Sequence, residues 1–145
     1  MKCRISGKET VEVFNLGDLQ MSDFIEPNEE PRTGTGEKPI PQDEMYGKYW
    51  YRSGINTTMR NLLKDVAVDC LSSIQINEGD VFLDIACNDG TMFDFIPDKY
   101  TKVGIDPADD SFLRESEKKA DFVVQDFFSA EAYKSTPYGR IKPKI

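Results

Sequence analysis

The spacing of apolar residues between positions 57 and 134 predicts helices that alternate with strands. Residues 57–76 carry them at helical spacing, from Met59 to Ile74, with Thr57 or Thr58 as the cap and Gly79 as a left-handed stop. Strand-like and helical segments then alternate, with strands at 80–86, 102–106 and 122–126 and helices at 91–96, 109–119 and 129–134. This βαβαβα order predicts an α/β fold with a parallel sheet.

The segments on either side of this pattern differ from it in composition. Residues 1–26 predict a small β-rich piece with apolar positions at Val11, Val13, Phe14 and Leu16. Residues 27–44 are rich in Pro, Gly and Glu, which is typical of a linker. The main domain is expected over 45–136. Residues 137–145, basic and broken by two prolines, are expected to be an irregular tail.

Each predicted strand ends near an aspartate: Asp84, Asp106 and Asp126. Because the carboxyl ends of parallel strands meet at one edge of a sheet, these side chains are expected to line one rim. The first is followed by a tight turn over 86–90. The alternative is that the aspartates only stop strands and cap helices.

The turn favours one ligand class. A dinucleotide fingerprint has three glycines where this chain has Ala86, Asn88 and Gly90. S-adenosylmethionine carries an ammonium group and no phosphate, so an acidic strand end suits it. We expect Asp106 to bind its ribose and Asp126 its adenine amino group. The predicted cofactor contacts are Asp84, Ala86, Cys87, Asn88, Asp89, Gly90, Asp106, Pro107, Asp126 and Phe127.

Aromatic side chains crowd around Arg52 in the segment 45–56. Aromatic rings can close a pocket, and an arginine can hold a carboxylate or phosphate through a forked contact. The alternative is that the rings pack against the front of the next helix. The residues predicted to form a lid or to contact substrate are Tyr46, Tyr49, Tyr51, Arg52 and Asn56.

Composition narrows the functional classes. The net charge of −8 argues against a nucleic-acid substrate. The sequence shows neither a membrane-length apolar run nor a signal peptide, so a cytoplasmic protein is expected. Three widely spaced cysteines predict no disulfide framework, and Cys70 falls on the apolar stripe of its helix. The sequence contains no histidine, which removes the commonest general base.

Several motifs resemble one family. Met45-Tyr46-Gly47, Tyr51–Asn56, Leu83–Thr91 and Gly104–Pro107 are similar, in order and spacing, to motifs of the bacterial sugar C-methyltransferases. The resemblance implies a partial Rossmann-like class I methyltransferase sheet and S-adenosylmethionine as donor. It implies cofactor contacts at 84–90, Asp106 and Asp126. The acceptor it implies is a nucleoside-diphosphate keto-sugar.

The chain also departs from that family. Residues from Cys3 to Gly17 are similar to the start of its zinc-binding module, but Ser6 replaces the second cysteine, so zinc is not expected. Ala86 replaces a glycine, which is expected to weaken cofactor binding. The family's catalytic residues would lie beyond Ile145, and only Tyr46, Tyr49 and Tyr51 remain as candidate bases.

Two functional hypotheses follow. The first is a truncated methyltransferase that holds the donor-binding half of the domain. The second is a non-catalytic remnant that binds S-adenosylmethionine or serves only as an interaction module.

Overall fold

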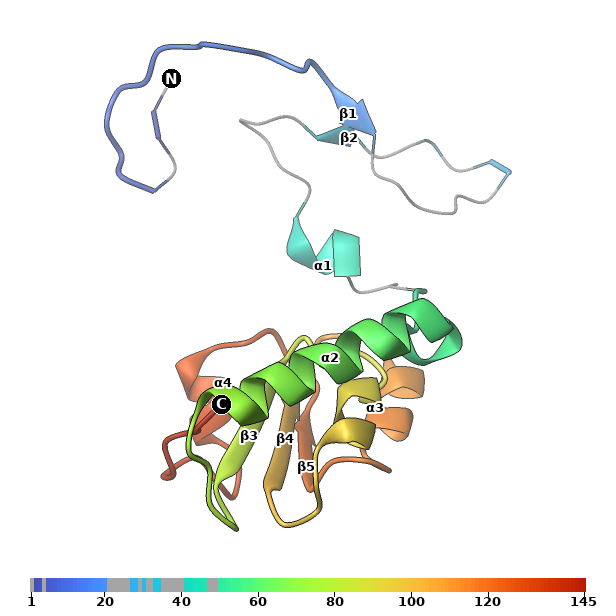
Figure 1. Ribbon diagram of the computed structural model, residues 1–145. Helices are drawn as coiled ribbons and strands as arrows, with labels where there is room; N and C mark the ends of the chain where they lie inside the picture. The colour runs from blue at the N-terminus through green and yellow to red at the C-terminus, as the bar shows by residue number, and fades with distance from the viewer. Residues whose placement is uncertain are drawn as a thin grey trace. The chain divides into compact units, whose positions relative to one another are not determined.

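The computed structural model describes residues 2–3, 5–20, 27–28, 30, 33–34, 41–46 and 50–145. The chain divides into two compact units, Met1–Met45 and Tyr46–Ile145. The second unit is a mixed α/β domain built on a three-stranded parallel sheet (Figure 1). Its elements are η1 (Ser53–Ile55), α2 (Thr57–Ser73), β3 (Val81–Ile85), η2 (Thr91–Phe95), β4 (Thr101–Ile105), α3 (Asp110–Ser116), β5 (Phe122–Val124) and α4 (Ala130–Lys134).

The sheet has the order β3-β4-β5, and all of its strands run in the same direction. Val81 pairs with Thr101 and Ile85 with Ile105, so β3 and β4 are aligned along their whole length. Their carboxyl ends therefore open onto the same edge of the sheet, which confirms the predicted parallel arrangement.

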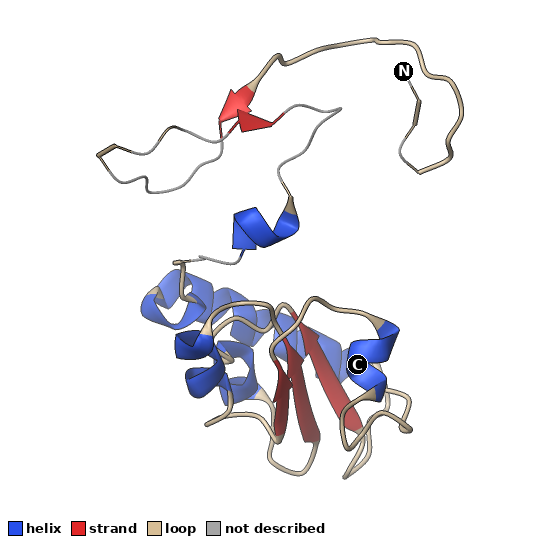
Figure 2. Ribbon diagram, turned by 180° about the vertical axis from the view of Figure 1, so that it is seen from behind, coloured by secondary structure: helices blue, strands red, loops and turns tan. Residues whose placement is uncertain are grey.

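Alternating side chains bury the two faces of the sheet under different helices. Phe82 packs in one core cluster with Ala67 of α2 and Phe93 of η2. Val81, on the other face, packs in a second cluster with Tyr133 of α4. This division arises because successive side chains of a strand point to opposite faces of the sheet. Helix α2 crosses in front of the sheet in Figure 1 and behind it in Figure 2.

Helix α2 differs from the prediction at both ends. Its cap is Asn56, whose side chain accepts from the amides of Thr58 and Met59, so the expected threonine cap is wrong. The helix ends at Ser73, where the hydroxyls of Ser72 and Ser73 hydrogen bond to the carbonyl of Asp69. Gly79 is left-handed, with φ of +81°, but it shapes the turn before β3 rather than the end of the helix.

The later elements are shorter than the predicted ones. The segment predicted as a helix at 91–96 is the 3₁₀ helix η2, which ends before Pro97. α3 and α4 begin at the side-chain caps Asp109 and Ser129. β5 ends at Val124, two residues before Asp126, so that aspartate lies in the loop after the strand.

Residues 141–145 form no strand, but the last residues of the described chain hydrogen bond to the backbone of β3. Ile145 donates its amide to the carbonyl of Val81 and accepts from the amide of Leu83, at 3.5 and 2.9 Å. Those two bonds flank Phe82 as in parallel pairing. The hydroxyl of Tyr133 reaches the carbonyl of Ile141 at 2.7 Å and anchors the turns that precede this contact.

The first unit contains short paired segments. β1 (Leu19–Gln20) pairs antiparallel with β2 (Thr33–Gly34), and α1 (Gln42–Tyr46) follows. β2 and most of α1 therefore fall inside the predicted linker. Residues 11–18 pair with no strand that the structure describes, contrary to the predicted β-rich piece. The apolar side chains expected to form its core are exposed at Val11, Val13, Phe14 and Leu16.

A turn at residues 5–6 lies within the expected zinc-knuckle-like segment. Lys2 and Glu9 form a β-bridge, and the Sγ atom of Cys3 accepts from the amide of Ser6 at 3.4 Å. Within the described parts of the chain, no group of three or more potential metal ligands comes together.

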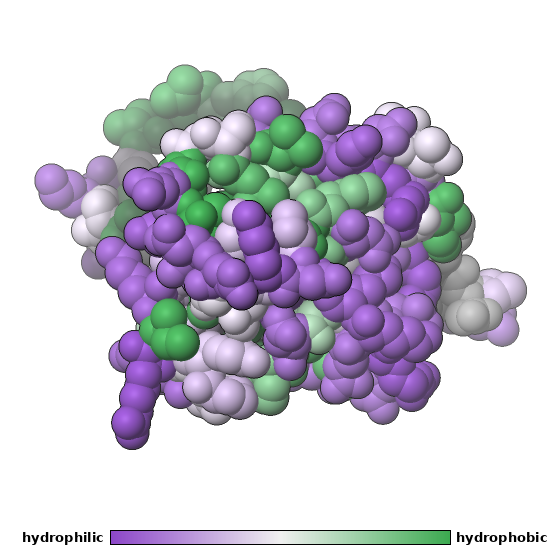
Figure 3. Space-filling view, turned by 60° about the horizontal axis from the view of Figure 1, so that its bottom comes forward, coloured by the Kyte–Doolittle hydropathy of each residue, from purple (hydrophilic) through white to green (hydrophobic). Residues whose placement is uncertain are grey.

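Hydrophilic residues form most of the face of the molecule drawn in Figure 3, and hydrophobic ones gather in a patch across its upper middle. Among the helices that the structure describes, none has both the length and the apolar character needed to cross a membrane.

Candidate functional site

The turn after β3 has a left-handed backbone at all three positions where a dinucleotide fingerprint has glycine. The φ angles are +64° at Ala86, +53° at Asn88 and +69° at Gly90. The amide of Ala86 donates to the carbonyl of Ile105 at 2.8 Å, which fixes the turn against the end of β4. The chain thus keeps a glycine-type shape with only one glycine, at a cost of roughly 1–2 kcal/mol for Ala86.

Close packing against β4 holds the turn in place. The side chain of Cys87 is buried, and a Cβ added at Gly104 would lie 2.7 Å from its Sγ atom. Burial, followed by the charges of Asp84 and Asp106, raises the pKa of the Cys87 thiol. The thiol is therefore part of the core and not a nucleophile, and only the backbone of this predicted contact residue is left to face a ligand.

Asp84 is the most perturbed carboxyl group at this edge. Burial, and then the neighbouring charge of Asp106, raises its pKa to about 7. Among the described residues no side chain forms an ion pair or a hydrogen bond with its carboxylate. A half-buried carboxylate beside a second one is a place where a cation would be stabilised.

Asp106, at the same edge, both holds the turn in place and can still accept a hydrogen bond from a ligand. Its Oδ2 atom accepts from the amide of Asn88 at 2.7 Å, and Oδ1 accepts from the amide of Ala108 at 2.8 Å. The carboxylate therefore orders the turn. Each oxygen keeps acceptor capacity for a further donor such as a ribose hydroxyl.

The remaining predicted contacts lie around this pair. Asp126 is exposed, and its Oδ1 atom accepts from the amide of Phe127 at 2.7 Å. It follows a strand parallel to the other two, so all three aspartates lie toward one edge of the sheet. Pro107 and Phe127 are half-buried. We call Asp84, Asp106 and the turn 86–90 the carboxyl-edge site.

The predicted lid segment is fastened to this turn by residues that the sequence had suggested only as cofactor contacts. The amide of Ser53 donates to Asn88 Oδ1 at 3.0 Å, and Asn88 Nδ2 donates to the carbonyl of Tyr51 at 2.9 Å. The amide of Gly54 donates to Asp89 Oδ2 at 2.8 Å. Asn88 and Asp89 therefore connect the segment from Tyr51 to Gly54 to the carboxyl-edge site.

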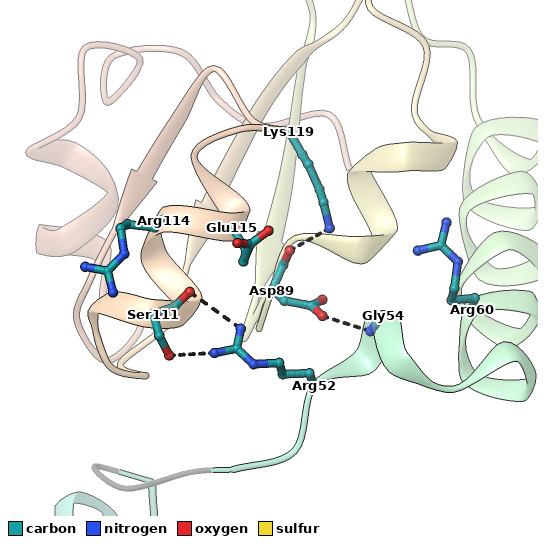
Figure 4. A pocket seen from close by; sticks show the side chains of 8 residues that line it. All are labelled: Arg52, Gly54, Arg60, Asp89, Ser111, Arg114, Glu115 and Lys119. Carbon is teal, nitrogen blue, oxygen red and sulfur yellow. Dashed lines mark hydrogen bonds between the residues drawn. The ribbon is translucent and has the colours of Figure 1, made fainter.

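Arg52 lies against α3. Its Nη2 atom donates to Ser111 Oγ at 2.6 Å (Figure 4). Its guanidinium carbon lies 4.1 Å from the centre of the Phe112 ring. Stacking on an aromatic ring holds the guanidinium plane in one orientation.

The other predicted lid residues are more dispersed. Tyr46 is exposed at the end of α1, and Tyr49 lies outside the described residues. Asn56 uses its side chain to cap α2. Trp50 is exposed and makes an edge contact with Tyr51, with ring centres 6.0 Å apart. In the described part of this segment, the contacts of Tyr51, Arg52, Ser53 and Gly54 position it against the domain.

A cavity of about 470 Å³ beside Arg52 was not anticipated from the sequence. Figure 4 shows the residues that line it: Arg52, Gly54, Arg60, Asp89, Ser111, Arg114, Glu115 and Lys119. They come from η1, α2, the turn after β3 and the region of α3, with Arg52 just before η1. Because they share no sequence motif, only folding brings them together.

No known protein-family model matches the chain, and no curated protein sequence matches it. The functional conclusion therefore depends on the site and on the motifs in the sequence.

Proposed function

We propose that the domain Tyr46–Ile145 binds S-adenosylmethionine at the carboxyl-edge site, as the donor-binding part of a Rossmann-like class I methyltransferase of the sugar C-methyltransferase type. The observation that carries this proposal is the pairing of Asp84 with Asp106 beside a turn whose backbone is left-handed at Ala86, Asn88 and Gly90.

Electrostatics support a cationic ligand here. The fold opposes ionisation of Asp84, because burial and Asp106 both disfavour its charged form. The ammonium group of the methionine portion would neutralise that charge. A pyrophosphate would add negative charge to it, so the site suits an adenosyl ligand without phosphate.

Topology also supports this location. The chain proceeds from β3 to β4 and β5 on one side, and residues 144–145 return to the other edge of β3. In open parallel sheets, ligands bind outside the carboxyl ends of the strands. The turn 86–90 follows β3 at that point.

Methyl transfer is the reaction that the family resemblance implies. A base would remove a proton beside the keto group of a nucleoside-diphosphate sugar, and the carbanion would attack the donor methyl group. The segment from Tyr51 to Gly54, hydrogen bonded to Asn88 and Asp89, would position the acceptor near the donor.

A second candidate is a non-catalytic protein that binds S-adenosylmethionine without transferring its methyl group. The observation in its favour is that the sequence has no histidine to act as base.

Calorimetric titration of the 145-residue chain with S-adenosylmethionine tests the binding proposal. We expect saturable binding that Asp84→Asn weakens roughly tenfold or more, because the ligand ammonium loses its carboxylate. Asp65→Asn removes the same charge from an exposed position on α2 and should leave the affinity within about twofold. Absence of binding by the folded wild-type chain would reject both candidates.

A methyl-transfer assay with a keto-sugar nucleotide separates the two candidates. Product formation by this chain would establish the methyltransferase. Binding of the donor without product would favour the non-catalytic protein.

A further inference from the structure

The cavity beside Arg52 has an unusual charge balance for this chain. The whole protein carries 26 acidic and 18 basic residues. Four cationic side chains line the cavity, at Arg52, Arg60, Arg114 and Lys119, against two acidic ones, at Asp89 and Glu115. A local excess of positive charge therefore occurs within an acidic protein.

Both acidic groups are already occupied. The carboxylate of Asp89 accepts from the amide of Gly54 at 2.8 Å and from the Thr91 hydroxyl at 2.5 Å. Glu115 pairs with Lys118 at 2.8 Å, and that contact lowers the pKa of its carboxyl group. The charges of Lys119 and Arg52 lower the pKa of Glu115 further, so this carboxylate offsets part of the positive charge at the cavity.

Three of the four cations form no ion pair with the described residues, although the pKa of Asp109, lowered first by its hydrogen bonds to Ser111, is lowered further by the charges of Arg52 and Arg114. Among the described residues, no acidic group lies within ion-pair distance of Arg52, Arg114 or Lys119, whereas Arg60 pairs with Asp94 at 3.1 Å. Lys119 donates to a neutral acceptor, the carbonyl of Asp89, at 2.9 Å. Arg52 is held by Ser111 and the Phe112 ring. Figure 4 shows Arg52 and Lys119 on opposite sides of Asp89.

We propose that this cavity binds a phosphoryl group of a phosphorylated small molecule. A single carboxylate could balance only one of the unpaired cations. A phosphoryl group carries up to two negative charges and several acceptor oxygens, which match an arginine fork together with a lysine ammonium. The volume of about 470 Å³ is within the range of small-molecule pockets.

This proposal does not depend on S-adenosylmethionine, which has no phosphate. Arg52, Arg114 and Lys119 are not part of the carboxyl-edge site, although Asp89 belongs to the turn 86–90. Pyrophosphate binding should therefore persist in Asp84→Asn, and each of the two proposals can fail without the other.

Calorimetric titrations of the full chain with inorganic phosphate and with pyrophosphate, at constant ionic strength, test the proposal. We expect saturable binding that weakens about fivefold or more in Lys119→Gln and in Arg114→Gln. Lys64→Gln is the control, because Lys64 is exposed on α2, does not line the cavity and removes the same charge. Lys64→Gln should change the affinity less than twofold.

The two ligands distinguish the source of the phosphoryl group. Equal affinity would assign a monophosphate, and tighter binding of pyrophosphate would assign a diphosphate. The proposal is overturned if the folded wild type binds neither ligand. It is also overturned if Lys64→Gln weakens binding as much as Lys119→Gln, since the effect would then be a general surface attraction. Lys119→Arg, which keeps the charge, should retain most of the affinity.

Discussion

The two edges of the sheet both carry aspartates, but those aspartates do different things. At the amino edge, Asp80 accepts from the amide of Asn77, and Asp121 accepts from the amide of Lys102, each at 2.8 Å. Asp98 pairs with the ammonium of Lys102 at 2.7 Å, and this contact lowers the pKa of its carboxyl group. Each of these three carboxylates has a structural partner.

At the carboxyl edge, Asp84 and Asp106 form no ion pair with any described residue. Asp84 has a raised pKa and no described partner, while Asp106 holds the turn through two backbone amides. An aspartate near a strand end is therefore not by itself evidence of a ligand site. A buried carboxylate whose desolvation cost is offset by no cation or hydrogen bond is stronger evidence of a ligand site.

The sharpest test of this difference is to remove the charge at each edge. The pKa of Asp84 rises from 3.8 to about 7 on folding, so folding favours its protonated form. The stabilisation that comes from protonated Asp84 is present in full below pH 3.8 and is lost as the pH rises through about 7. The free energy of unfolding falls by up to about 4 kcal/mol over this range. Asp84→Asn should abolish this loss and stabilise the ligand-free chain at pH 8.

Urea denaturation at pH 4 and pH 8 measures this effect. Asp121→Asn is the counterpart at the amino edge, and it should destabilise the chain by about 1 kcal/mol because it weakens a hydrogen bond to Lys102. Equal effects of the two substitutions at pH 8 would contradict the difference between the edges.

Two left-handed glycines allow a second test. A Cβ at Gly90, on the carboxyl side, would lie 2.8 Å from the Cα atom of Ser116, whereas one at Gly79, on the amino side, would meet nothing within 4 Å. Gly79→Ala should therefore cost about 1 kcal/mol from backbone strain alone. Gly90→Ala should cost about 3 kcal/mol because steric overlap is added. Chemical denaturation measures both, and similar losses would show that the turn 86–90 is not closely packed.

Ala86→Gly tests the strain stored in the turn. Ala86 has φ of +64°, which glycine adopts without penalty. The substitution should stabilise the folded chain by about 1 kcal/mol in urea denaturation. If the carboxyl-edge site binds S-adenosylmethionine as proposed, affinity should also rise, because a methyl group is removed where the backbone approaches the ligand. A loss of stability would mean that Ala86 is not strained.

Tyr133→Phe tests the return of the chain to β3. The hydroxyl donates to the carbonyls of Ile141 and Tyr138 at 2.7 and 3.1 Å, so its removal should cost about 1 kcal/mol. Hydrogen exchange should accelerate at the amide of Leu83, which bonds to Ile145, and not at the amide of Val103 inside the sheet. Unchanged exchange at Leu83 would show that Tyr133 does not hold this pairing.

Much of the sheet could be predicted because its information is local. Apolar runs fixed β3, β4 and β5 to within one or two residues, and the parallel direction followed from the helices between them. The ends of α2 were less predictable, because Asn56 and Ser73 compete with neighbouring polar residues for the same backbone groups. The hydrogen bonds of Ile145 to β3 were not predicted, because Pro143 and the basic residues beside it are poor strand formers and the segment is irregular.

The sequence by itself determined the order of the elements and the aspartates that follow them, since hydrophobic period and residue type are properties of short segments. Only the tertiary structure decided which of those aspartates is left without a partner. It alone faces Cys87 into the core, attaches the segment after Trp50 to Asn88 and Asp89, and gathers Arg52, Arg114 and Lys119 around one cavity. Burial and charge pairing depend on residues distant along the chain, so no local pattern contains them.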